Sequence, residues 1–338
     1  MTEPSAWTAE TVSADDSWIR VLTSSQAAEL RSATEKVVAL NCKPCEFDAE
    51  LFSLPRYSAE LAAVLEQLEN GRGFVLLRGL PVEALDLDGL LLLYSGIGAH
   101  LGRVITQNSQ GDRIGWVTDR GDDYASAGVR GHGSRAAIRP HCDSADVVGL
   151  LCVSTAVRGG KSIIASAMTI YNEILAHHPE YLGVLCRGFH INLAGKGPTG
   201  RADELSHHRI PVFSYFRGRL SCRFNQKQIE DAALIRGEPL TALEQEAIEC
   251  VGSLALRSDI RFEMKFEPGD LQLLNNHCIL HAREAYEDDP AGGQRRLLLR
   301  MWINLFQGRP LAPEFADRLN TGPRGEVAVV KTGTEAAG

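Results

Sequence analysis

Residues 268–283 read PGDLQLLNNHCILHAR. The Pro-Gly pair is typical of a tight turn, and the mostly apolar residues 270–275 that follow it are typical of a buried strand. His281 lies just beyond that predicted strand. The segment therefore predicts a strand that begins at a turn and is followed closely by a candidate metal-ligating histidine.

The rest of the chain predicts a mainly β fold around this strand. Apolar runs indicate further strands at 73–79, 145–154, 161–166, 211–217, 219–224, 260–266 and 295–305. Helical spacing indicates helices at 59–70 (capped by Ser58), 83–100, 168–177 and 242–256 (capped by Thr241 and Glu244). Many strands with no regular strand–helix alternation favour an α+β, mainly β jelly roll or similar barrel with flanking and inserted helices.

The chain is expected to form one large domain with loose ends. Residues 1–15 are polar and residues 321–338 are rich in Gly, Thr and Ala, so both are predicted to be loose tails around a single domain at 16–320. Residues 103–137 are rich in glycine and charge and show little apolar periodicity. Long irregular segments of this kind are usually lids or binding loops, so we expect a lid beside a site.

Composition excludes several classes of protein. The chain has 338 residues and a net charge of -8, which argues against a nucleic-acid binder that relies on phosphate neutralisation. No apolar run is long enough to cross a membrane, and the polar, acidic start is unlike a signal peptide, so we expect a cytoplasmic protein. The eight cysteines are then expected to be reduced thiols, and the Cys42-x-x-Cys45 pair lacks a second ligand pair for zinc.

His141-x-Asp143 is the second candidate metal-binding motif. On an extended chain the two side chains point to the same face, so both can reach one metal ion. A histidine bonded to a nearby aspartate is also a common structural pair, so the motif alone is weak. With His281 it completes two histidines and one carboxylate, the facial triad of non-haem Fe(II) oxygenases. His277 could share the face of His281, but we interpret it as a neighbour of the site.

Two arginines on one face of a strand form the third candidate element. Arg296 and Arg300 share a face of the predicted strand 295–305, while Leu297 and Leu299 take the other face. If that face lies inside the barrel, each guanidinium needs an anion, and its planar fork suits a carboxylate. If the face lies in solvent, the two are ordinary surface cations.

From about Gly73 to Leu305 the chain resembles the taurine dioxygenase / 2,4-dichlorophenoxyacetate dioxygenase family of Fe(II)- and 2-oxoglutarate-dependent oxygenases. The resemblance rests on motifs in family order: 73–79, His141-x-Asp143, Gly159-Gly160-Lys161-Ser162, Asn276-x4-His281-x-Arg283 and Arg296-x3-Arg300. The family more often has an acidic residue and Thr where this chain has Lys161 and Ser162, so the hydroxyl is retained.

The resemblance implies a double-stranded β-helix core and an oxygenase reaction. It implies His141, Asp143 and His281 as ligands of Fe(II), and Arg296 with Ser162 as the site for the distal carboxylate of 2-oxoglutarate. Arg300 matches a position that contacts the anionic group of the substrate in some members. Dioxygen and 2-oxoglutarate would be consumed, succinate and CO₂ released, and a C–H bond of a small, anionic or amino-acid-like molecule hydroxylated or desaturated.

Two alternatives remain open from the residues alone. A non-catalytic jelly-roll metal-binding sensor could use the same triad, although a purely structural metal would not require Arg296 and Ser162. A zinc hydrolase lacks an obvious separate general base. The sequence gives no basis for choosing one substrate, for assigning an oligomeric state, or for deciding whether Arg300 binds substrate or 2-oxoglutarate.

Overall fold

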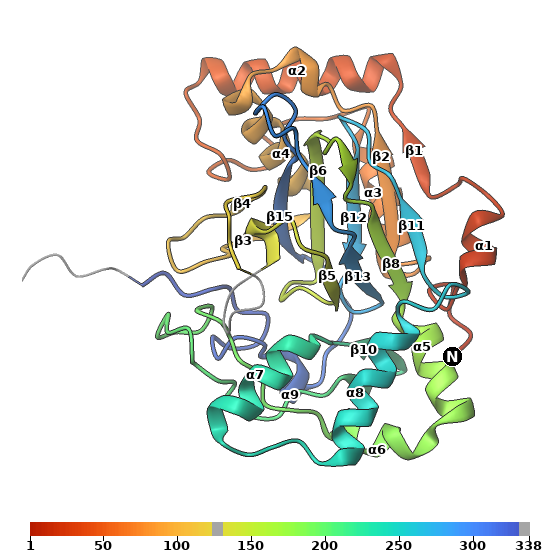
Figure 1. The fold of residues 1–338 in the computed structure, drawn as a ribbon. Helices are drawn as coiled ribbons and strands as arrows, with labels where there is room; N and C mark the ends of the chain where they lie inside the picture. Colours follow the sequence, from red (N-terminus) through yellow and green to blue (C-terminus); the bar gives the residue numbers. More distant parts are fainter. Residues whose placement is uncertain (124–130, 331–338) are drawn as a thin grey trace, which may run out of the picture.

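A computed structural model describes residues 1–123 and 131–330, and it places two β-sheets face to face (Figure 1). The large sheet has the strand order β1-β2-β12-β6-β15-β3, with β4 also pairing with β15. Its strands are β1 (Ile19–Val21), β2 (Phe74–Arg78), β3 (Gly102–Ile105), β4 (Ile114–Val117), β6 (Val147–Ser154), β12 (Leu271–Asn275) and β15 (Leu297–Leu305). Except for the parallel pair β1–β2, neighbouring strands are antiparallel.

The small sheet has the order β11-β8-β13-β5, and two short ribbons flank the pair of sheets. Its strands are β5 (Ile138–His141), β8 (Ser162–Ser166), β11 (Phe262–Met264) and β13 (Ile279–Arg283). The ribbons are β7 (Arg158–Gly159) with β14 (Tyr286–Glu287), and β9 (Phe213–Phe216) with β10 (Arg219–Cys222). This arrangement is the predicted jelly-roll core, a double-stranded β-helix.

Strand β15 shows why the sequence builds two layers. Leu299, Met301 and Ile303 are fully buried in the core between the large sheet and the helices outside it. Arg296, Leu298 and Arg300 lie on the opposite face and line the cavity between the sheets. The predicted alternation is therefore confirmed, because the period of two sends the arginines inward while the intervening apolar residues pack under the helices.

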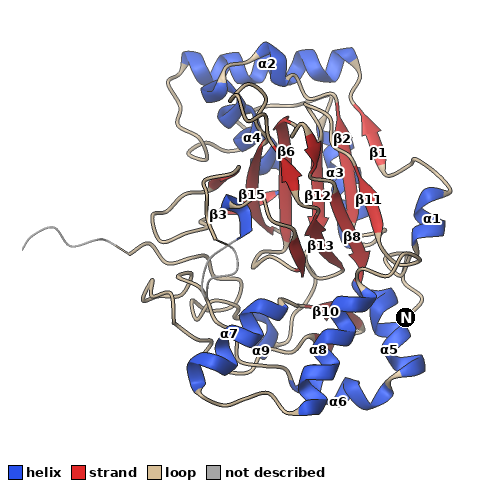
Figure 2. Cartoon of the chain, in the orientation of Figure 1, coloured by secondary structure: helices blue, strands red, loops and turns tan. Residues whose placement is uncertain are grey.

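Helices cover the outer face of the large sheet and close one end of the barrel (Figures 1 and 2). The outer layer holds α2 (Ser24–Ala39), α3 (Ser58–Glu69) and α4 (Leu87–Leu101), preceded by the 3-10 turn η1 (Val82–Ala84). At the end lie α5 (Ala167–His177), η3 (Pro179–Tyr181), α6 (Leu182–Arg187), α7 (Gln226–Arg236), α8 (Ala242–Leu254) and α9 (Pro313–Ala316). A Cβ on Gly96 of α4 would lie 2.4 Å from the ring of Phe52, so glycine is required there for close packing.

Several predicted elements need correction. His281 does not lie beyond a strand but inside β13, a separate strand that the short segment after the Asn275-Asn276 turn forms. The region 103–137 is not wholly irregular, since it contributes most of β3, all of β4 and the turn η2 (Gly131–Gly133); residues 124–130 of this lid lie outside the described residues. Ser58 is the first residue of α3 rather than its cap. The capping box of Thr241 and Glu244 on α8 is confirmed.

Neither end of the chain behaves as a loose tail where the structure describes it. Residues 1–15 include α1 (Ala9–Ser13), and Trp7 and Val12 are buried in the core between the sheets. At the other end Val327 is buried and its carbonyl accepts a hydrogen bond from Thr106. Residues 331–338 of the predicted tail lie outside the described residues.

The burial of Trp7 predicts a stability effect. Its ring packs edge-on against Phe74 with centroids 5.4 Å apart, and its indole N–H donates to the Arg72 carbonyl at 2.9 Å. Trp7→Ala is expected to lower the free energy of unfolding by roughly 3–5 kcal/mol, because it leaves a cavity and an unpaired carbonyl. Trp116→Ala is the control, since that ring is 36% exposed. Equal small losses in chemical denaturation would mean that the N-terminal segment is not part of the core.

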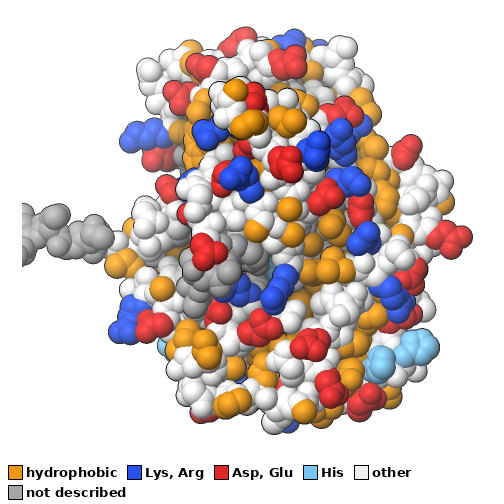
Figure 3. Space-filling model, viewed as in Figure 1, with side chains coloured by type: hydrophobic (Ala, Val, Ile, Leu, Met, Phe, Trp, Pro, Cys, Tyr) orange, Lys and Arg blue, Asp and Glu red, His pale blue; other side chains and the backbone are white. Residues whose placement is uncertain are grey.

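The visible surface carries charges of both signs dispersed among apolar and neutral groups, without one large patch of a single sign (Figure 3). Among the described residues, no helix combines the length and apolar character needed to span a membrane.

Candidate metal and cosubstrate site

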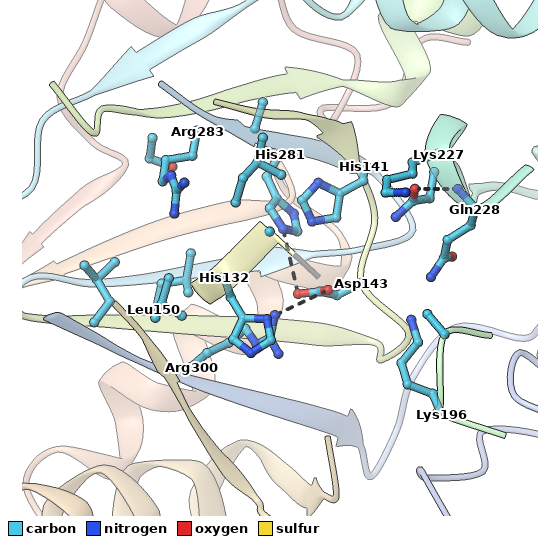
Figure 4. Close-up of a pocket in the computed structure, with 18 of the residues that line it drawn as sticks. His132, His141, Asp143, Leu150, Lys196, Lys227, Gln228, His281, Arg283 and Arg300 are labelled. Atoms are coloured by element: carbon cyan, nitrogen blue, oxygen red, sulfur yellow. Dashed lines mark hydrogen bonds and ion pairs between the residues drawn. The ribbon is translucent and has the colours of Figure 1, made fainter. Parts of the chain in front are cut away.

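The triad of His141, Asp143 and His281 comes together at one end of the cavity between the sheets (Figure 4). His141 ends β5, and antiparallel pairing places His281 of β13 directly opposite it, with ring centroids 4.2 Å apart. Asp143 follows two residues later in the loop. One ligand atom from each residue lies within 4.8 Å of the other two. Two imidazoles and one carboxylate at this spacing can bind one divalent ion on one face and leave other positions open.

Hydrogen bonds outside the triad fix two of its members. The Nδ1 of His141 lies 2.9 Å from the Arg139 carbonyl, an arrangement that leaves Nε2 for a metal. The backbone N–H of Asp143 donates to the Asn276 side-chain oxygen at 3.0 Å. Asn276 was expected to fix its own turn. It instead connects the β12–β13 turn to the loop that carries the carboxylate.

Charge and burial prepare these side chains for a metal. Burial lowers the pKa of His281 to about 3, and the neighbouring His141 lowers it further; burial also lowers the pKa of His141. Burial alone would raise the pKa of Asp143, but the positive charge of Arg300 and the two imidazoles outweigh it and hold that pKa well below its usual range. Neutral imidazoles and an ionised carboxylate are the protonation states that metal ligation requires.

Arg296 and Ser162 line the same cavity, as the sequence predicted. Arg296 is 4% exposed, its guanidinium lies 5.1 Å from the Tyr286 ring centroid, and its Nη1 has no hydrogen-bond partner among the described residues. Ser162 is also buried, and its hydroxyl donates to Gln272 at 3.0 Å. A buried guanidinium with an unused donor fits an incoming carboxylate. Gln272 escaped the sequence analysis, although a lone amide in the apolar run of β12 was a usable signal.

Arg300 lies between the metal triad and the lid region. Its Nε donates to Gln107 at 2.7 Å, its Nη1 is 4.0 Å from Asp143, and its guanidinium lies 5.0 Å from the Trp302 ring centroid. Arg300 is therefore closer to the metal-ligand side of the cavity than a solvent-facing cation would be. Gln107 has no motif around it that could have indicated this contact.

His277 is not part of the triad. It is buried, and its Nε2 lies 2.9 Å from Asp146, whose carboxylate also pairs with Arg318 and Arg324 of the C-terminal segment. This confirms the interpretation of His277 as a neighbour of the site. Cys42 and Cys45 are free thiols away from the cavity, and the Cys45 sulfur lies 3.4 Å from the Ser95 hydroxyl.

The His277–Asp146 pair predicts a pH effect on stability. Burial lowers the pKa of His277 to about 4, although Asp146 opposes the shift and Arg318 and Arg309 add to it. The unfolded chain then binds a proton that the folded chain refuses between about pH 6.5 and 4, so stability falls as the pH falls through this range. From pH 7 to pH 5, denaturant titration of the metal-free protein should show about 2 kcal/mol more loss than in His277→Gln. Parallel pH profiles would contradict this assignment.

The cavity also contains charged residues for which the sequence carried no motif. Lys196, Lys227 and Asp231 lie in the segment between α6 and the middle of α7, and all three line the wall facing the triad. The cavity has a volume of about 120 Å³, consistent with a small ligand. These side chains converge only through the fold of the insert, which spacing along the chain does not reveal.

Comparisons with known proteins agree with this geometry. Residues 39–302 match the family described as "Taurine catabolism dioxygenase TauD, TfdA family". The FR-33289 synthase of Streptomyces rubellomurinus is 32% identical over 98% of this chain and 97% of its own. The taurine hydroxylase-like protein SAT17 of Stachybotrys chartarum is 27% identical over 88% of this chain and 77% of its own.

A solved structure extends the likeness to the fold. Asparagine oxygenase, crystallised with Fe(II), 3-hydroxyasparagine and succinate, superposes with a TM-score of 0.66 over 85% of this chain and 93% of its own, at 14% identity. With the matched family model and the curated relatives, the chain belongs to the TauD, TfdA family of non-haem iron- and 2-oxoglutarate-dependent oxygenases.

Proposed function

We propose that the protein hydroxylates a C–H bond of a small molecule, with His141, Asp143 and His281 holding Fe(II). Arg296 and Ser162 bind the distal carboxylate of 2-oxoglutarate. The observation that carries this proposal is that one cavity contains both the triad and a buried guanidinium with an unused donor. When bound, the iron and 2-oxoglutarate supply the oxidation of substrate by dioxygen, with release of succinate and CO₂.

The chain's own residues provide geometry and exclude water. The imidazoles of His141 and His281 are neutral in the fold, so they are available as nitrogen ligands without first losing a proton. Arg296 fixes one end of the dicarboxylate by charge and hydrogen bonding, which orients the other end toward the triad. Apolar Leu150, Leu298 and Phe266 of the cavity wall limit the water that reaches the reacting groups.

The retained carboxylate of Asp143 favours hydroxylation or desaturation over halogenation. The alternative of a silent metal-binding sensor is less favourable, because it gives no role to the buried Arg296. The names of the curated relatives, a synthase and a hydroxylase-like protein, support a catalytic role on a small molecule.

Succinate release tests the proposal. Anaerobically purified protein is supplied with 2-oxoglutarate and oxygen, with and without Fe(II), and succinate is quantified. We expect iron-dependent succinate formation that candidate substrates stimulate. Metal-independent succinate formation, or none under any condition while the protein remains folded, would contradict the proposal.

A further inference from the structure

The wall of the cavity opposite the small sheet carries a buried ammonium group. Lys196 is only 6% exposed, and Figure 4 shows it rising from its loop toward Asp143. Burial is the main cause of the lowered pKa of His141, and the positive charge of Lys196 adds to it, so the ammonium is within electrostatic reach of the triad. Burying an ammonium is costly, and this one faces the space that substrate would occupy.

The loop that carries Lys196 is held in an uncommon conformation. Ala194 and Gly195 have φ values of 50° and 76°, so two successive residues adopt the left-handed region. Backbone hydrogen bonds fix the loop: the N–H of Leu193 donates to Glu204 at 2.8 Å, and that of Lys196 donates to Leu193 at 3.1 Å. Strained, pinned backbone beside a cavity is a common feature of ligand-binding segments.

The first turns of α7 contribute a second cation to the same wall. Lys227 and Gln228 line the cavity beside Lys196 (Figure 4). Lys227 pairs with Asp231 at 3.1 Å, and both side chains are mostly buried. This wall therefore contains two ammonium groups and one carboxylate, with the Gln228 amide between them.

Charges around the cavity do not balance without a further anion. Among the described residues the lining contains five cations and two carboxylates: Lys196, Lys227, Arg283, Arg296 and Arg300 against Asp143 and Asp231. Residues 124–130 contain no Asp or Glu that could compensate. Arg283 is engaged with the carbonyls of Ser134 and Ala136, so it is set aside.

A ferrous ion and 2-oxoglutarate together with Asp143 and Arg296 form an electrically neutral group. What remains on the substrate side is Lys196, Lys227 and Arg300 against Asp231, an excess of two positive charges. In a site shielded from water such an excess attracts and orients a ligand of opposite charge. Lysine ammonium groups bind phosphate-type oxygens as point charges, and arginine adds directed hydrogen bonds.

We infer that the substrate carries a doubly charged tetrahedral oxyanion, a phosphate monoester or a phosphonate, and that Lys196 is its main anchor, assisted by Lys227 and Arg300. This inference rests on the proposed function, because the charge balance assumes that iron and 2-oxoglutarate occupy the triad and Arg296. Asp231 limits the positive charge of the wall by pairing with Lys227, so it is expected to weaken anion binding rather than support it.

Calorimetric binding tests the inference without turnover. The protein is loaded with Zn(II), which does not activate oxygen, and titrated first with 2-oxoglutarate and then with methyl phosphate, methylphosphonate, methanesulfonate or acetate at a pH where the first two are dianions. We expect at least one of the two dianions to bind at least ~10-fold more tightly than either monoanion, and the better dianion identifies the phosphate ester or the phosphonate.

Variants with opposite expected signs separate charge from folding. Lys196→Met should weaken binding of the better dianion at least ~10-fold while 2-oxoglutarate still binds, and Lys196→Arg should restore part of it. Asp231→Asn should strengthen dianion binding, which a merely unfolded variant cannot do. Lys43→Met, at an exposed position outside the cavity, should change neither affinity.

The outcomes separate the two proposals. If 2-oxoglutarate binds but the dianions bind no better than acetate or methanesulfonate, or if Lys196→Met binds them like the unaltered protein, the substrate inference is overturned and the proposed function stands. If 2-oxoglutarate does not bind the Zn(II)-loaded protein, the proposed function itself is contradicted.

Discussion

Replacing His141 with alanine is expected to abolish iron-dependent succinate release while the protein remains folded. His141 supplies one of three donor atoms that lie within 4.8 Å of each other, and its removal leaves only one imidazole and one carboxylate. Two donors no longer define the facial arrangement that holds iron with open positions. The side chain sits in the cavity wall rather than in the apolar core, so the free energy of unfolding should change little. Iron content and succinate release are measured on the same preparation.

His177→Ala provides the matched control, because that imidazole is exposed near the end of α5. It should retain full iron content and turnover. Asp143→Ala should behave like His141→Ala in turnover. If His141→Ala retained both iron and turnover, the assignment of the triad would be wrong.

Arg296→Ala should raise the apparent KM for 2-oxoglutarate by at least ~10-fold, because a charge-assisted hydrogen bond of roughly 1.5–3 kcal/mol is lost. The unused Nη1 of this buried guanidinium is the reason to expect so large an effect. Initial rates of succinate release are measured against 2-oxoglutarate concentration at saturating iron.

Arg295→Ala is a close control, since the neighbouring arginine is exposed and only its carbonyl makes a recorded contact, accepting from Ser154. Its KM should match that of the unaltered protein. If Arg296→Ala showed an unchanged KM, Arg296 would not be part of the cosubstrate site, and the increase should instead be sought at Arg300.

Much of the fold and site could be predicted because short-range patterns determine them. The two-residue period of β15 places Arg296 and Arg300 on one face, and the H-x-D spacing places His141 and Asp143 together. The capping box at Thr241 marks the start of α8 for the same local reason.

Other features depend on long-range contacts and could not be read from the sequence. His281 lies within β13 because pairing with β5 and β8 extends the segment after the turn. Residues 1–15 look polar, yet the fold buries Trp7 against Phe74, 67 positions later. Lys196 enters the site only because the insert between α6 and α7 folds back over the cavity.

Visible absorption under anaerobic conditions tests the central assignment most directly. Fe(II) is added to the metal-free protein, and 2-oxoglutarate is then titrated in the absence of oxygen. Chelation of iron by both the triad and the keto acid predicts a new visible band that saturates at one equivalent of iron, persists in Arg295→Ala and is absent in His141→Ala. A folded protein that gives no such band, or a His141→Ala variant that gives the full band, would contradict the account.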